Sequence, residues 1–374
     1  MNAEYDIIII GIGAMGSAAA CHLAQRDKKI LGIDRFTPPH SMGSSHGQTR
    51  IIREAYFEGP QYVPIIQHSY RNWGKLEKEY GEQLYLQTGG LMMGLPGCEI
   101  VKGAKLSADL HHLPYEILGA KEIREKFPAF HPTDDIIAIW EPRAGILFPE
   151  KCIEAYIKTA IKNNADFLFN EPAVTWKATN EGVCVTTSNG KHYAKQLLLT
   201  AGAWLKDFLP GLDLPLTVER QVLYWFEPAA QADIFKPGKF PVFIWDPGTG
   251  NDFYGFADLG QGIKIAKHHR GEITDPDSIN RNVKEEEIEL IRSFLNRFIP
   301  AANGKLLSTE ICMYTNTPDF NFRIFHHPQH AQVLAASICS GHGFKFSSAF
   351  GEILADILMN NKSSFDLSLF EHSF

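Results

Sequence analysis

The chain has 374 residues, of which 44% are hydrophobic and 21% are charged, so it can bury a core large enough for two domains. This composition excludes a disordered tail, a collagen-like fibre and a disulfide-stapled miniprotein. Lysine and arginine total 36 against 43 acidic residues, a formal net charge of -7, so neither nucleic acid nor an acidic membrane is an expected partner.

Cysteine usage indicates a reducing compartment. The six cysteines are too sparse for a disulfide scaffold and no two form a CxxC motif, so we expect a cytoplasmic protein. The apolar residues 7–24, with small side chains just before Cys21, imitate a secretory signal. Glu4 and Asp6 stand where a signal peptide carries positive charge, which argues against secretion. No other stretch approaches the roughly 18 uninterrupted apolar residues of a membrane span.

Residues 5–34 predict a βαβ unit. Residues 5–10 are β-branched and bounded by glycine, as in a strand that is buried on both faces of a parallel sheet. A helix rich in small residues follows to about Asp27, and residues 29–33 predict a second strand that ends at Asp34.

The turn between this strand and helix carries the pattern GxGxxG, as Gly11, Gly13 and Gly16. Gly11 permits a tight turn, Gly13 lets backbone N–H groups approach a pyrophosphate, and Gly16 allows close packing of helix and strand. Asp34 stands where an acid accepts hydrogen bonds from adenosine ribose hydroxyls. The pattern therefore predicts a bound dinucleotide, and FAD and NAD are both open at this point because they share the ADP half.

Farther along the chain, the patterns predict an α/β protein with an additional antiparallel sheet. Residues 221–267 carry alternating aromatic side chains, which favours an antiparallel sheet with one wall facing a cavity. The other expected elements are helices over 62–80, 121–127, 285–298 and 347–359 and strands over 183–188, 196–200 and 333–338. No repeat or Pro/Ser-rich linker divides these patterns, so we expect two domains that interleave.

Three histidine pairs, at 111–112, 268–269 and 326–327, invite a metal site. None carries HExxH or cysteine spacing, so no metal is expected. Neither a GxSxG motif nor a P-loop is present.

The loop over residues 38–53 resembles the flavin-contacting loop of the monomeric sarcosine oxidase and N-methyltryptophan oxidase family, which are amine oxidoreductases of the D-amino-acid-oxidase-like type. Further blocks extend the resemblance over essentially the whole chain, at residues 62–64, 200–204, 264–268, 312–315 and 340–348. The resemblance implies a Rossmann-like FAD-binding domain interleaved with a substrate domain built on a large mixed or antiparallel sheet. The implied boundaries are 1–78, 145–215 and 320–374 for the FAD domain, and 79–144 and 216–319 for the substrate domain.

The resemblance also implies FAD bound covalently through the sulfur of Cys312, as an 8α-S-cysteinyl linkage. Such attachment needs a thiolate, and His46 and Arg50 match a basic pair that lowers the pKa of a nearby thiol. The alternative for Cys312 is a small buried hydrophobe, which is the role we assign to the other five cysteines. The residues expected to bind the cofactor are Gly11, Gly13, Ala14, Met15, Gly16, Asp34, Arg35, Ser44, His46, Arg50, Val174, Ala201, Gly202, Trp204, Cys312, Met313, Gly341, Gly343, Phe344 and Lys345.

The implied reaction oxidises a secondary N-methyl amino acid, such as sarcosine or N-methyltryptophan, to the amino acid and formaldehyde, and reduces molecular oxygen to hydrogen peroxide. A monomer is expected. The expected catalytic residues are Lys264, Arg53, Lys345, His268, Tyr254 and Tyr314. Arg53 and Lys345 match the pair that binds the substrate carboxylate, a task suited to the planar guanidinium.

Tyr254, Tyr314 and His268 match residues that line the substrate pocket, although tyrosines also serve in ordinary cores. Lys264 matches the lysine near flavin N5 that activates oxygen by stabilising developing negative charge. A solvent-facing strand lysine is its alternative.

The chain departs from the family pattern at Ser45 and Gln48, where a histidine and an aspartate are usual. Ile244 and Trp245 occupy a strand that faces the substrate in relatives, and the residues there vary between branches. Three alternatives therefore stay open: an FAD oxidase or dehydrogenase of a cyclic or other α-amino acid such as pipecolate, proline or glycine, a non-catalytic FAD-binding module, and an NAD dehydrogenase.

Overall fold

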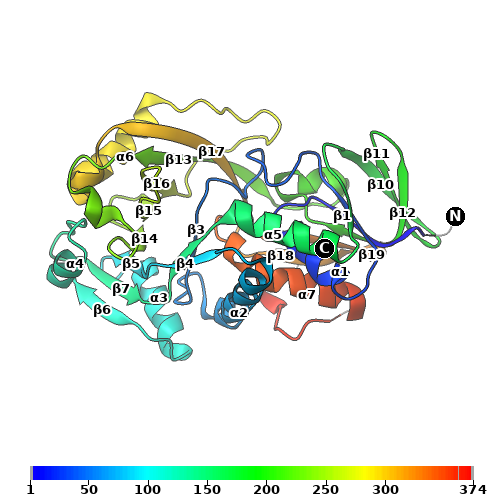
Figure 1. Cartoon of the computed structure of the whole chain (residues 1–374), viewed down its shortest axis with the longest axis horizontal. Helices are drawn as coiled ribbons and strands as arrows, with labels where there is room; N and C mark the ends of the chain where they lie inside the picture. The colour runs from blue at the N-terminus through cyan, green and yellow to red at the C-terminus, as the bar shows by residue number, and fades with distance from the viewer. Residues whose placement is uncertain (1–2, 361, 372–374) are drawn as a thin grey trace.

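The computed structural model describes residues 3–360 and 362–371. Figure 1 shows an elongated molecule with a β-sheet towards each end of its long axis. The first sheet has eight strands, in the order β10-β11-β12-β1-β2-β9, with β19 beside β12 and β18 beside β19. Its strands are β1 (Tyr5–Ile10), β2 (Ile30–Ile33), β9 (Asp166–Leu168), β10 (Ala173–Thr179), β11 (Gly182–Thr187), β12 (Lys191–Leu199), β18 (Arg323–His327) and β19 (His330–Ser337).

The centre of this sheet is parallel and buried on both faces. β1 pairs in parallel with β12 and β2, and β12 pairs in parallel with β19. Successive side chains of a strand point to opposite faces, so Ile7 and Ile9 join one hydrophobic core and Ile8 and Ile10 join another. The continuous isoleucine run of β1 is thus explained by burial on both sides.

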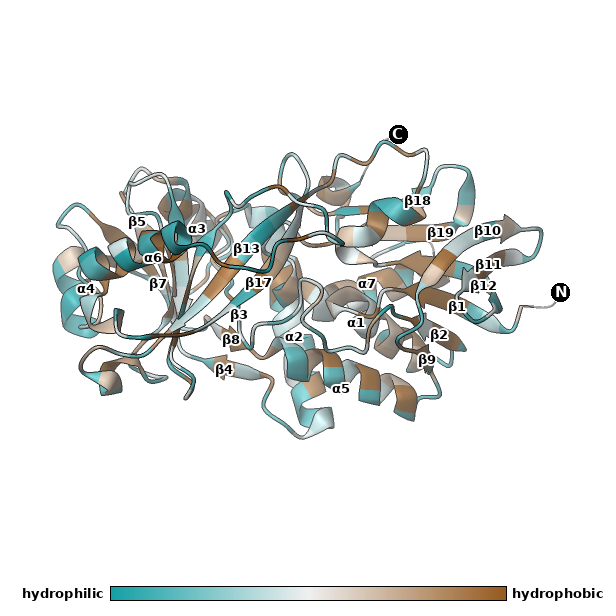
Figure 2. Ribbon diagram, turned by 90° about the horizontal axis from the view of Figure 1, so that it is seen from above, coloured by the Kyte–Doolittle hydropathy of each residue, from teal (hydrophilic) through white to brown (hydrophobic). Residues whose placement is uncertain are grey.

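Four helices form the layer on the Ile7 side: α1 (Ala14–Ala24), α2 (Val63–Tyr80), α5 (Pro149–Lys162) and α7 (Ser347–Asn360). α1 and α7 pack closely because both present small residues. A Cβ added to Gly351 would lie 2.5 Å from the Cβ of Ala18. Figure 2 shows both helices mostly in the brown of hydrophobic residues.

The second sheet has eight strands, in the order β17-β13-β16-β15-β14-β5-β7-β6. Its pairings are antiparallel except that β14 runs parallel to β5, which makes the sheet mixed. The strands are β5 (Gly90–Gly94), β6 (Glu116–Gly119), β7 (Ile137–Glu141), β13 (Thr217–Phe226), β14 (Val242–Trp245), β15 (Asp252–Phe256), β16 (Ile263–His268) and β17 (Leu306–Asn316). Helices α3 (Glu99–Leu110), α4 (Ala120–Lys126) and α6 (Glu285–Phe298) accompany it, and β3 (Arg50–Ile52), β8 (Gly145–Leu147) and β4 (Tyr85–Gln87) form a separate three-stranded sheet.

Side-chain alternation gives the second sheet two unlike faces. Val222, Tyr224 and Phe226 of β13 pack in an aromatic core that includes Phe294 and Phe298 of α6. The residues between them point the other way, and Leu223 lies opposite Ala266 while Trp225 lies opposite Lys264. This second face, which also carries Cys312, is the one that meets the functional site.

The fold class predicted from the sequence is confirmed, with differences in detail. The helix over 285–298 has the predicted bounds, whereas α1 ends at Ala24 rather than near Asp27. The predicted antiparallel region over 221–267 is mixed where β14 meets β5. Helices α3 and α5 were not predicted. Among the described residues, no helix is both long and apolar enough to span a membrane.

Candidate functional site

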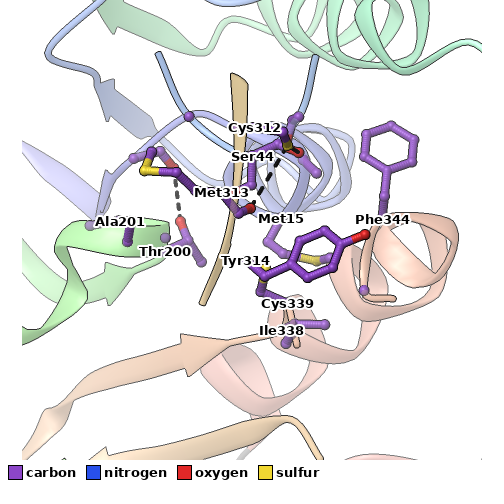
Figure 3. Close-up of a pocket in the computed structure, with 18 of the residues that line it drawn as sticks. Met15, Ser44, Thr200, Ala201, Cys312, Met313, Tyr314, Ile338, Cys339 and Phe344 are labelled. Carbon is purple, nitrogen blue, oxygen red and sulfur yellow. Dashed lines mark hydrogen bonds between the residues drawn. The ribbon is translucent and has the colours of Figure 1, made fainter. Parts of the chain in front are cut away.

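A cavity of about 440 Å³ is lined by residues from both sheets. Figure 3 shows how distant segments meet there: Met15 at the start of α1, Ser44 in the loop after β2, Thr200 and Ala201 after β12, and Cys312 on β17. Most of the residues predicted to bind cofactor or substrate line this cavity. Gly16, His46 and Lys264 do not line it and lie behind its wall.

The glycine-rich turn has the close packing that its sequence predicts. Gly11 has φ +91°, and a Cβ there would lie 2.6 Å from the carbonyl oxygen of Thr200. A Cβ on Gly16 would lie 1.9 Å from the carbonyl oxygen of Gly11, so a side chain cannot replace either glycine. A Cβ on Gly13 would meet only the Ser45 hydroxyl, at 3.9 Å, which leaves room for a ligand in front of α1.

The N-terminus of α1 has the features of an anion-binding site. Gly13 is its N-cap residue, no side chain caps it, and its first turn carries no acidic residue. The free N–H groups and the helix dipole therefore favour a phosphate here. The buried carboxylate of Asp34 accepts the backbone N–H groups of Ile12 at 2.7 Å and Phe36 at 2.9 Å, and so fixes the turn.

Asp277, which was not predicted, contacts two residues that line the cavity. Asp277 forms an ion pair with Arg35 at 2.6 Å and accepts the indole N–H of Trp204 at 3.0 Å. Val174 also lines the cavity and is 65% exposed.

Cys312 lies among basic groups. Its Sγ lies 3.6 Å from a guanidinium nitrogen of Arg50 and donates to the carbonyl oxygen of Ser44 at 3.6 Å, a neighbour labelled in Figure 3. Burial raises the pKa of the thiol. The opposing effects of His46, Arg50 and Lys264 are larger and lower this pKa to about 7. A thiolate is thus well populated near neutral pH, as a nucleophilic cysteine requires.

His46 is buried beside this thiol. Burial lowers its pKa, while Cys312 and Glu310 raise it to about 9. Its Nδ1 lies 3.0 Å from a carboxylate oxygen of Glu310, a partner that was not predicted. The imidazole is therefore cationic at neutral pH when it faces the thiolate.

Lys264 is 2% exposed and its ammonium is fully enclosed. Its Nζ donates to the carbonyl oxygen of Gly47 at 2.7 Å, and to the carbonyl and hydroxyl oxygens of Thr49, each at 3.1 Å. Burial, and then the charge of Arg50, hold the pKa of Lys264 well below its ordinary value. The alternative of a solvent-facing lysine is wrong, because the side chain points under the loop that carries Gly47.

Arg53 and Lys345 belong to a buried basic cluster, called the anion site below because Arg53 holds a carboxylate there. Arg53 is 1% exposed, and its guanidinium lies 4.2 Å from the ring centroids of both Tyr56 and Phe57. Lys345 donates to the carbonyl oxygen of His342 at 2.9 Å and to the Tyr56 hydroxyl at 3.4 Å. Burial, followed by repulsion from Arg53, lowers the pKa of Lys345 to about 7.

This anion site already contains one carboxylate. A single guanidinium nitrogen of Arg53 lies 2.7 and 2.6 Å from the two oxygens of Glu58. Burial raises the pKa of Glu58, but Arg53, His342 and Lys345 lower it more, so the carboxylate is charged. Nothing in the sequence pattern around Arg53 indicated this partner.

Aromatic side chains form the wall next to the anion site. Tyr254 and Tyr314 line the cavity with His268, whose Nδ1 lies 3.4 Å from the Tyr314 hydroxyl. Burial, and then His269, hold the pKa of His268 well below its ordinary value, so its imidazole is neutral. Gly341, at φ +76°, has no room for a side chain, since a Cβ would lie 2.7 Å from the Tyr314 ring.

The two residues of β14 lie on opposite faces. Ile244 lines the cavity, as expected of a residue near a substrate. Trp245 is fully buried on the other face, where its ring packs 5.7 Å from Phe294 and 4.8 Å from Phe298. Of the two residues on this strand, only Ile244 is therefore directed at the cavity, because adjacent strand residues alternate in direction.

The groups present fit FAD: a phosphate-binding helix start, an acid at the ribose position, and cations beside a reactive thiol. Fold and site together define a nucleotide-dependent oxidoreductase. Residues 6–357 match the family model described as FAD dependent oxidoreductase. The chain belongs to that family.

The chain is also similar, over almost its whole length, to two kinds of oxidase within reach of sequence comparison. The chain is 40% identical over 375 residues to monomeric sarcosine oxidase of Streptomyces avermitilis, covering 99% of this chain and 98% of that protein. It is 35% identical over 370 residues to N-methyl-L-tryptophan oxidase of Yersinia pestis, covering 98% of each. Among solved structures, NikD, described as an unusual amino acid oxidase, superposes with a TM-score of 0.86 at 20% identity over 99% of this chain and 98% of that one, which shows a shared fold.

Proposed function

We propose that this protein is an FAD-dependent oxidase that demethylates a secondary N-methyl amino acid, with sarcosine and N-methyltryptophan as the two types of substrate. The products are the amino acid and formaldehyde, and oxygen becomes hydrogen peroxide. The observation that carries the proposal is the buried pair of cations, Arg53 and Lys345, set beside the aromatic wall of Tyr254 and Tyr314. Two buried basic side chains, with one carboxylate paired to Arg53, form a site that a substrate carboxylate fits.

Arg53 and Lys345 would bind and orient the substrate. The substrate carboxylate replaces Glu58 at Arg53 or joins it there, and its charge raises the pKa of Lys345 so that the ammonium form predominates. Anchoring the carboxylate fixes where the N-methyl group lies, which is a large part of catalysis by positioning. Bound FAD supplies the two-electron oxidation of the C–N bond, and the neutral amine is the form that reacts.

The other site residues have distinct proposed tasks. Neutral His268 and the two tyrosines shape the pocket without adding a charge that would oppose loss of hydride from the substrate. Lys264, enclosed beside Arg50, would stabilise negative charge that develops as oxygen is reduced. Cys312 would hold the cofactor through its sulfur, a role supported by the cationic groups that lower its pKa.

We also propose that the chain divides as its sequence predicts, with residues 1–78, 145–215 and 320–374 binding FAD and the remainder forming the substrate domain. All strands of the first sheet fall in the former ranges and all strands of the second sheet in the latter. A cytoplasmic monomer remains our expectation. The six cysteines all lie in the described part of the chain, and none of them is in a disulfide bond.

A substrate panel with peroxide detection tests the proposed function. We expect turnover with sarcosine or with larger N-methyl amino acids, and formaldehyde as a co-product. Turnover confined to proline, pipecolate or glycine would replace the proposal with the α-amino acid oxidase alternative. A yellow protein that oxidises no amine would instead indicate a non-catalytic flavin module.

A further inference from the structure

Glu310, His46 and Cys312 form a continuous carboxylate–imidazole–thiol arrangement. Glu310 and Cys312 are two residues apart on β17, opposite Leu223 and Gln221 of β13, so strand alternation directs both to one face of the sheet. His46 comes from the loop after β2. Its Nδ1 lies 3.0 Å from the Glu310 carboxylate, and Cys312 is the group that most strongly raises the pKa of its imidazole.

The second nitrogen of His46 is the feature that needs an explanation. The side chain is 3% exposed, and its Nε2 has no hydrogen-bond partner among the described residues. A buried polar nitrogen without a hydrogen-bond partner destabilises the fold by about 1–3 kcal/mol. A functional role for this nitrogen would explain why the fold carries that cost. Because the Glu310 carboxylate can only accept at Nδ1, the neutral ring carries its proton there and Nε2 is left as an acceptor.

We propose that Glu310 is a positioning residue that orients His46 so that Nε2 takes the thiol proton of Cys312. The S–H bond of Cys312 breaks and an N–H bond forms at Nε2, with no change in oxidation state. The resulting thiolate lies beside Arg50, and the imidazolium lies between the thiolate and the Glu310 carboxylate. The inference rests on the proposed attachment of FAD to Cys312 and assigns the groups that prepare the thiol for it.

The surrounding charges agree with this arrangement. The thiol is faced by His46 from the loop, Arg50 from β3 and Lys264 from β16, and by the uncharged Tyr254 and Tyr314 from β15 and β17. Glu150 acts on both Arg50 and Lys264, and Glu310 acts on Lys264 and pairs with His46. All three cations lower the thiol pKa, and Glu310 acts on the thiol by favouring the cationic form of His46.

Cys339 is an internal comparison. It is also buried next to β17, where its sulfur accepts the backbone N–H of Thr315 at 3.3 Å. Burial is the main cause that raises its pKa, and the other main contributions come from two backbone N–H groups, Cys312 and Ser44. Burial in this region does not by itself produce a reactive thiol.

The test measures covalent attachment of flavin to the full-length chain. Flavin-free chain is obtained under riboflavin limitation, its fold is checked by circular dichroism, and FAD is then added across a range of pH. Acid precipitation and intact mass give the covalent fraction with time. The variants are Glu310→Gln, His46→Asn and the double variant, with Glu286→Gln on the exposed start of α6 as the control.

We expect Glu310→Gln to slow attachment about tenfold at pH 7 and to raise the pH midpoint by roughly one unit, since loss of the carboxylate lowers the His46 pKa and raises that of the thiol. The double variant should be no slower than His46→Asn alone, because Glu310 acts through His46. Alkylation of Cys312 by iodoacetamide in the flavin-free chain should show the same shift without any cofactor, while Cys339 reacts slowly in every variant.

Attachment and alkylation rates of Glu310→Gln equal to those of wild type would overturn the inference and leave the linkage intact. A double variant slower than His46→Asn would also overturn it, because Glu310 would then act independently. A wild-type chain that releases all its flavin in acid would refute the linkage itself, and a low alkylation midpoint of Cys312 in that chain would still support the proton relay.

Discussion

A guanidinium nitrogen of Arg53 lies 2.6 Å from a carboxylate oxygen of Glu58, inside the site proposed to receive the substrate carboxylate. The ion pair neutralises the buried guanidinium while no substrate is bound. It also makes Glu58 a competitor of the substrate, because both carboxylates interact with Arg53.

Glu58→Gln should therefore tighten binding of a simple carboxylate. We expect the Kd of methoxyacetate, which resembles the substrate but lacks an amine, to fall about tenfold, a gain of about 1.4 kcal/mol. The flavin absorption spectrum during titration gives the Kd. Thermal stability should fall at the same time, because Arg53 loses its partner when no ligand is present. Weaker methoxyacetate binding by a folded variant would show that Glu58 supports the site and does not compete for it.

Carboxylate binding should weaken as the pH rises through about 7, since the pKa of Lys345 in the free site is lowered to about 7. Below this pH the ammonium attracts the ligand, and above it the neutral amine does not. We expect the methoxyacetate Kd to increase by at most about tenfold per pH unit until binding by Arg53 alone remains. Lys345→Met should raise the Kd at pH 6 and abolish this pH dependence. A variant that keeps the wild-type pH profile would show that another group titrates.

Lys264→Met should slow reoxidation of the reduced flavin by oxygen on the order of a hundredfold, because the enclosed cation is lost where negative charge develops. Reduction of the flavin by substrate under anaerobic conditions should be nearly unchanged. Stopped-flow absorbance measures both half-reactions separately. Slow anaerobic reduction together with normal reoxidation would assign Lys264 to substrate oxidation.

Ile244 and Trp245 offer a matched pair on one strand. Ile244→Ala enlarges the cavity and should shift kcat/KM towards N-methyl amino acids with larger side chains. Trp245→Ala, on the opposite face, should lower the free energy of unfolding by about 3 kcal/mol or more and leave the ratio of kcat/KM values unchanged. A selectivity change confined to the Trp245 variant would contradict the proposal that the substrate lies on the face of the sheet that carries Ile244.

The nucleotide end could be predicted from the sequence because its parts are local. Gly11, Gly13 and Gly16 lie within one turn, and Asp34 follows at the end of the next strand, so spacing alone specifies their geometry. Resemblance to the family also brought Cys312, His46 and Arg50 to attention, and the structure places these three together.

The parts that sequence could not supply depend on tertiary contacts. Glu58 pairs with Arg53 because the chain after Arg53 folds back on the guanidinium. No periodic sequence pattern predicts this turn. Glu310 carried a weak signal, since strand alternation puts it on the face of Cys312, but its partner His46 lies 264 positions away. The parallel pairing of β14 with β5 similarly joins segments that are remote in sequence.

An anaerobic titration of the purified protein with N-methyl amino acids shows whether these compounds reduce the bound flavin. We predict that sarcosine or N-methyltryptophan bleaches the flavin absorbance, and that admitting oxygen restores it, with one formaldehyde and one hydrogen peroxide formed for each substrate molecule consumed. Flavin that stays oxidised with every N-methyl amino acid, but is bleached by proline or glycine, would contradict the proposed N-demethylation.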